Sequence, residues 1–153
     1  IKSALKTPDK MCEIRRYLLN SPVLGTLIYN ICMSRQKLNS GFVLKYFNNK
    51  KSISQNLIDT CSENAHLGGS NAKYLFTSTE CHYTTVSISK AVSKIDNSIY
   101  IINGSCDTNA IESAKLYKSL NPAIESVTIE NAKHYPQIEQ PIKFIKNIDI
   151  FLS

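Results

Sequence analysis

The order of chemical groups in the last third of the chain constrains the fold more than any other feature. An apolar, Ile-rich run occupies residues 98–103, and Asp107 follows it after a short turn. A helical pattern over 109–120 leads to a second apolar run at 124–129, which His134 follows. Such runs separated by a helix are typical of buried parallel strands. Because the carboxyl ends of parallel strands meet at one edge of a sheet, we expect Asp107 and His134 to lie close together.

The rest of the chain has a different pattern. Residues 7–95 show helical spacing with short breaks, beginning at the helix-start sequence Thr7-Pro8-Asp9. A final amphipathic helix is predicted over 141–152, where it would cover one face of the sheet. We therefore predict a helical region at 1–96 and a strand–helix–strand–helix region at 97–153.

Two parallel strands do not make a stable sheet by themselves, because such sheets need several strands and cover on both faces. The chain also begins with Ile1, and its first six residues have no apolar core of the kind a secretory leader needs. These features predict a partial chain whose remaining strands come from elsewhere.

Composition narrows the class of protein. The 153 residues suffice for one domain, 42% are hydrophobic, and no run of eighteen apolar residues predicts a membrane span. The five cysteines are an odd number without a CxxC pair, so we expect neither a metal site nor a disulfide framework, but reduced thiols in a cytoplasmic protein.

Charge is distributed unevenly. Residues 1–60 hold ten Lys and Arg against three Asp and Glu, a net charge of +7, whereas residues 61–153 carry −1. The excess indicates either a basic surface for an acidic partner or solvated lysines in a Lys- and Asn-rich chain. Because no nucleic-acid-binding motif accompanies the charge, we expect no nucleic-acid partner.

An Asp–His pair in contact has a defined chemical use. The carboxylate accepts the imidazole Nδ1–H and fixes the tautomer, which leaves Nε2 free as a general base. The structural alternative is that Asp107 caps the following helix and His134 is a surface residue at a strand end.

Two motifs carry a family resemblance. The first is Ile101-Ile102-Asn103-Gly104-Ser105-Cys106-Asp107, and the second runs from His134 to Pro141, with Pro136 and Glu139 between them. Residues 98–153 resemble the C-terminal part of the α/β-hydrolase fold, whose acid and histidine follow its last two strands. Members of the family often have Gly directly before the histidine, where this chain has Lys133. They also commonly have Pro within a few residues after the acid, whereas this chain has Thr108-Asn109-Ala110 there.

The resemblance implies that Asp107 is the triad acid and His134 the triad base of a capped serine hydrolase. The fold class expected is α/β: a C-terminal portion of a doubly wound sheet preceded by a helical cap at 1–96. The expected reaction is hydrolysis of a small ester, thioester or amide, without a metal or organic cofactor. The nucleophile elbow would lie in a missing N-terminal half, in the same or a separate chain, so this chain would be inactive alone. The alternative is a non-catalytic basic module for an acidic partner.

The nucleophile is the missing component. The nearest match to Gly-x-Ser-x-Gly is Gly68-Gly69-Ser70-Asn71-Ala72, but a helix stop followed by a Ser cap explains it more simply. Glu139 is expected to support the start of the last helix. Cys106 is expected to be a buried small hydrophobic residue. Packing or surface roles are expected for His66 and His82, and core packing for Tyr29, Tyr46, Tyr74 and Tyr83.

Overall fold

The computed structural model describes residues 7–153. Residues 1–6, where the sequence predicts no secretory leader, lie outside the described part. Contacts between Cα atoms divide the chain into two compact units. Among the described residues, the helical unit comprises 7–40 and 54–87, and the sheet unit comprises 41–53 and 88–153. Segments 41–53 and 88–96 lie within the helical region predicted from the sequence at 1–96 but group with the strands.

The helical unit is built from helices that begin where the sequence supplies caps. Asp9 accepts the backbone N–H of Cys12 (2.8 Å) at the start of α1, and Ser54 accepts that of Leu57 (3.1 Å) at the start of α4. The elements are α1 (Lys10–Asn20), α2 (Leu24–Cys32), α3 (Arg35–Gly41), α4 (Gln55–His66), the 3₁₀ turn η3 (Gly69–Asn71) and α5 (Ala72–Glu80). Every helix within residues 7–153 is too short or too polar to cross a membrane.

The sheet unit contains the two strands and the elements around them. It starts with the π-helical turn η1 (Phe42–Tyr46) and the 3₁₀ turn η2 (Lys50–Ser52), and resumes with α6 (Ser89–Val92), β1 (Ile99–Gly104), α7 (Thr108–Leu120), β2 (Ile124–Ile129), α8 (Pro136–Glu139) and α9 (Pro141–Leu152). Strands β1 and β2 are parallel, with Ile99 opposite Ile124 and Gly104 opposite Ile129. Their carboxyl ends therefore coincide.

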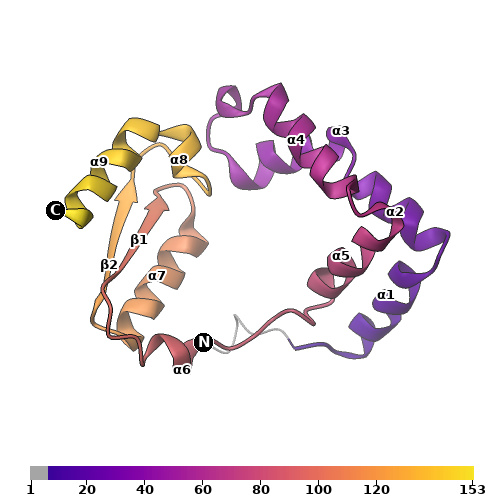
Figure 1. Ribbon diagram of the computed structural model, residues 1–153, viewed down its shortest axis with the longest axis horizontal. Coiled ribbons are helices and arrows are strands. Elements are labelled where there is room, and N and C mark those ends of the chain that lie inside the picture. The colour runs from indigo at the N-terminus through magenta and orange to yellow at the C-terminus, as the bar shows by residue number, and fades with distance from the viewer. Residues whose placement is uncertain (1–6) are drawn as a thin grey trace. The chain divides into compact units, whose positions relative to one another are not determined.

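Helices cover the small sheet on both sides. Figure 1 shows α7 on one side of the two strands and α9 on the other. The ring of Tyr100 in β1 stacks on that of Phe151 in α9, with centroids 4.7 Å apart and planes at 9°. Ile124, Ile129 and Ala114 are almost fully buried, so the core of this unit lies between the strands and α7.

The prediction of a doubly wound α/β sheet is wrong for this chain. Within residues 7–153 the sheet has only β1 and β2, and most residues are helical, so the fold is mainly helical with a small parallel sheet. The physical reason is that β-branched apolar runs occur only at the two strands, whereas most other apolar side chains recur at helical spacing.

Candidate functional site

Asp107 is held at the carboxyl end of β1, where the chain turns into α7. Its Oδ1 accepts the backbone N–H of Ala110 (3.0 Å), so the side chain caps the helix. The turn is closed by the backbone N–H of Asp107, which donates to the carbonyl of Gly104 (3.1 Å). One carboxylate oxygen is thus used by the helix, and the other is available to a neighbour.

The loop that carries His134 lies against the loop that carries Asp107. The backbone N–H of Cys106 donates to the carbonyl of Ala132 (2.9 Å), and the backbone N–H of Ser105 donates to the carbonyl of Ile129 (2.9 Å). A Cβ on Gly104 would lie 2.3 Å from the Ala132 carbonyl oxygen, so only glycine permits this approach. The two loops are therefore fixed to each other by backbone contacts.

The structure brings Asp107 and His134 into direct contact. Nδ1 of His134 lies 2.9 Å from Oδ2 of Asp107, and the carboxylate side chain is 13% exposed while the imidazole is 50% exposed. Burial, the largest single influence, raises the pKa of Asp107, but hydrogen bonds from His134 and Ala110, with the charges of His134 and Lys133, leave that pKa below 3.8. Because an ionised carboxylate can only accept, the proton of this hydrogen bond belongs to Nδ1.

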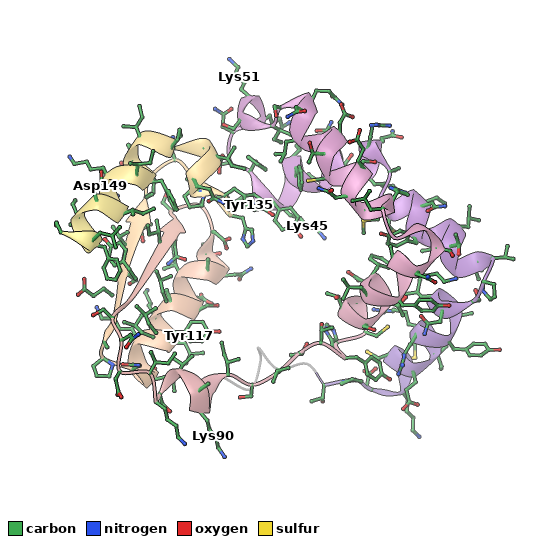
Figure 2. The ribbon with its side chains drawn as sticks, in the orientation of Figure 1. Lys45, Lys51, Lys90, Tyr117, Tyr135 and Asp149 are labelled. Atoms are coloured by element: carbon green, nitrogen blue, oxygen red, sulfur yellow. The ribbon has the colours of Figure 1, made fainter. Side chains whose placement is uncertain are left out.

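Segment 42–46 packs against the histidine. The backbone N–H of His134 donates to the carbonyl of Tyr46 (3.0 Å), and the two rings have centroids 5.3 Å apart. Tyr135 lies edge-on to the imidazole and contacts Phe42, Tyr46 and Phe47. Figure 2 shows Tyr135 beside the segment that carries Lys45.

An open cleft of about 710 Å³ lies at the pair, entirely within the sheet unit. Its walls come from residues 44–46, from 106–110 with Ser113, and from Lys133 and His134. The size is in the usual range for a small-molecule site. The pair is therefore reachable by a ligand.

Within residues 7–153 no hydroxyl or thiol is hydrogen-bonded to the imidazole. Cys106, Thr108 and Ser113 line the cleft, but the only side-chain hydrogen bond of His134 in the described chain is to Asp107. A base with a free Nε2 can take a proton from a group brought to it. The described residues thus provide an acid–base pair without a bound nucleophile.

Ser70 does not have the surroundings of a nucleophile elbow. It lies exposed in η3, which follows helix α4 rather than a strand, and Gly69 before it has a φ of +55°. His66 is in the helical unit as well, with Nδ1 2.6 Å from the carbonyl oxygen of Ser62. His82, also in this unit, adopts a left-handed backbone with φ of 62°.

The weaker candidates divide between the units. Tyr29 is buried in the helical unit, where its hydroxyl bonds the carbonyl of Ala65. Tyr74 and Tyr83 are exposed there, and cationic side chains approach both rings. Tyr46, in contrast, contacts the catalytic candidate His134. Its sequence position gave no indication of this, because a long-range contact leaves no local pattern.

Glu139 has a different role from the one expected. Its carboxylate does not cap the last helix; it accepts the backbone N–H groups of Asn48 and Asn49 (both 2.8 Å) and of Lys133 (2.7 Å). The first two donors lie about ninety positions earlier in the chain. Sequence spacing therefore could not reveal them.

The described side chains do not gather into a metal site. Across residues 7–153, no three of the His, Cys, Asp and Glu side chains are arranged to hold an ion. All five cysteines are free thiols, and the expectation of a buried Cys106 is wrong, because this side chain is exposed in the turn between β1 and α7.

Comparison with known proteins gives a structural match. No protein-family model matches the chain, and no curated protein does. Its fold is similar to that of a solved structure, a membrane phospholipase A described as a novel bacterial virulence factor, with a TM-score of 0.61 and 17% identity. The match covers 80% of this chain but 39% of the phospholipase chain, so the chain spans well under half of that protein's length. At this identity the likeness concerns the fold.

Proposed function

We propose that this chain supplies the acid and the histidine of a serine-type hydrolase of the α/β-hydrolase family. The observation that carries the proposal is the 2.9 Å hydrogen bond between Asp107 and His134 beside an open cleft. Further support comes from the two sequence motifs and from the fold neighbour, whose name places it among hydrolases. The proposed substrate is a small ester, thioester or amide.

In the proposed reaction, His134 acts through Nε2 while Asp107 holds Nδ1–H. Nε2 takes the proton of a nucleophilic hydroxyl as its oxygen bonds to the substrate carbonyl carbon. The bond to the leaving group then breaks, and that proton passes from Nε2 to the leaving group. A water molecule, deprotonated by the same nitrogen, releases the acid and regenerates the hydroxyl. Asp107 stabilises the imidazolium formed in each half.

The nucleophile and the groups that stabilise the oxyanion are proposed to come from outside residues 7–153. They could belong to a further segment of the same polypeptide or to a second chain. The chain alone is then expected to be inactive, and the helical unit is proposed to act as a cap.

A fluorophosphonate probe tests this proposal, with the labelled residue mapped by mass spectrometry. We expect no labelling of the chain alone, and labelling when an upstream segment with a nucleophile elbow is supplied. His134→Ala should then abolish labelling, whereas His66→Gln, which removes an imidazole of the helical unit, should not. Labelling of the chain alone at Ser70, or labelling that survives His134→Ala, would contradict the proposal.

A further inference from the structure

Glu139 connects two segments that are far apart in the sequence and meet at His134. Oε1 accepts the N–H groups of Asn48 and Asn49, and Oε2 accepts the N–H of Lys133. All of these groups belong to the sheet unit. A half-buried carboxylate that satisfies three backbone donors holds their peptide groups in one arrangement.

The bonded peptide groups are neighbours of the acid–base pair. Lys133 directly precedes His134, whose own N–H donates to the carbonyl of Tyr46, and the Lys133 ammonium donates to the carbonyl of Leu44 (3.1 Å). Residues 44–49 and 133–134 are thus joined by several hydrogen bonds, three of them made by Glu139. The cleft wall at 44–46 is part of the same joined structure.

From this arrangement we infer that Glu139 is a positioning residue for His134. It fixes the peptide before the histidine and keeps the Tyr46 ring against the imidazole, so that Nδ1 stays directed at Asp107. The catalytic consequence rests on the proposed function, but the positioning itself does not. No ion pair of Glu139 competes for this role among the described residues, since its hydrogen-bond partners there are all backbone N–H groups.

The test is NMR of the full chain carrying Glu139→Gln. Glutamine has the same shape but only one acceptor oxygen, so at least one of the three N–H groups must lose its partner. We expect the Tyr46–His134 nuclear Overhauser contacts to weaken and the Nδ1–H resonance of His134 to broaden or disappear. Glu125→Gln is the matched control, because it removes the same charge from an exposed position of β2.

A purely structural role makes a different prediction. If Glu139 had only a structural role, Glu139→Gln would lower the melting temperature but leave the ring contacts and the Nδ1–H resonance intact below that temperature. This result would overturn the inference. If the variant does not fold, hydrogen exchange on the unaltered chain decides. The amides of Asn48, Asn49 and Lys133 should all exchange slowly, and fast exchange at all three would overturn it.

Activity provides a separate readout once a segment with the nucleophile has been supplied. Glu139→Gln should lower kcat about tenfold to a hundredfold with little change in KM, because a misplaced base affects the reaction more than binding. If the NMR result is as expected but no hydrolysis is ever found, the positioning inference stands and the hydrolase proposal fails.

Discussion

At the scale of single residues, Asp107 performs two tasks with its two oxygens. Oδ1 caps helix α7 through the N–H of Ala110, and Oδ2 bonds Nδ1 of His134. Both interactions favour the ionised form. A substitution that preserves one task and removes the other can therefore separate the helix cap from the acid–base pair.

Comparing Asp107→Asn with Asp107→Ala should separate the helix cap from the acid–base pair. Asparagine caps a helix about as well as aspartate, so the alanine variant should be less stable than the asparagine variant by about 1 kcal/mol at neutral pH. Because the folded-state pKa of Asp107 is lowered, its ionised form adds stability above pH 3.8, and this contribution is lost as pH falls through the lower folded pKa. Urea unfolding from pH 7 to pH 2.5 measures both effects.

For the pH series, the stability difference between the unaltered chain and Asp107→Asn should be constant at neutral pH and shrink below pH 3.8. A difference that grows on acidification would mean that the carboxyl group is not stabilised in its charged form.

Gly104 lets the loops that carry Asp107 and His134 approach each other. A Cβ at this position would lie 2.2 Å from the carbonyl oxygen of Lys133, and a backbone atom cannot move away without moving the His134 loop. Gly104→Ala should therefore lower the free energy of unfolding by about 3 kcal/mol. The control is Gly41→Ala, where nothing lies within 4 Å of the added carbon and the backbone is helical. Equal stability of the two variants would contradict the close approach.

At the scale of elements, local patterns predicted strands β1 and β2 and helix α7 well, and the long-range contacts of the sheet unit poorly. The predicted strands at 98–103 and 124–129 correspond to β1 and β2 within one residue, and the predicted helix at 109–120 to α7. Apolar runs and an Asp cap are local properties. The backbone contact of Tyr46 with His134 and the bonds of Glu139 to Asn48 and Asn49 join residues about ninety positions apart, and they use backbone groups that any sequence would offer.

Asn121 anchors helix α7 to its neighbours. Its buried amide donates to the carbonyls of Val92 and Ile95 (both 2.8 Å) and accepts the N–H of Ala123 (2.9 Å). Asn121→Ala leaves these groups without partners and should cost about 2–3 kcal/mol of stability. Asn97→Ala, at an exposed position, is the control and should change stability by less than about 0.5 kcal/mol in chemical denaturation. A small loss at both positions would contradict the anchoring role.

At the scale of the whole molecule, the doubly wound sheet was the part of the prediction that failed. The two motifs indicated the strand ends correctly in sequence, but they carry no information on how many other strands accompany them. The described chain has two strands and many helices, and each of its two units has its own contacts. The acid–base pair nevertheless lies within one unit, so its geometry is set by residues of that unit.

The measurement that tests the central claim most directly is long-range ¹H–¹⁵N NMR of the three histidines. We predict that His134 carries its proton on Nδ1, with a strongly downfield resonance, and that Asp107→Asn moves the proton to Nε2. The reason is that the amide oxygen is retained as the cap of Ala110, which turns an N–H donor towards Nδ1. His66, whose Nδ1 bonds a carbonyl, should not respond. An Nε2–H tautomer of His134 in the unaltered chain, or a tautomer indifferent to Asp107→Asn, would contradict the acid–base pair.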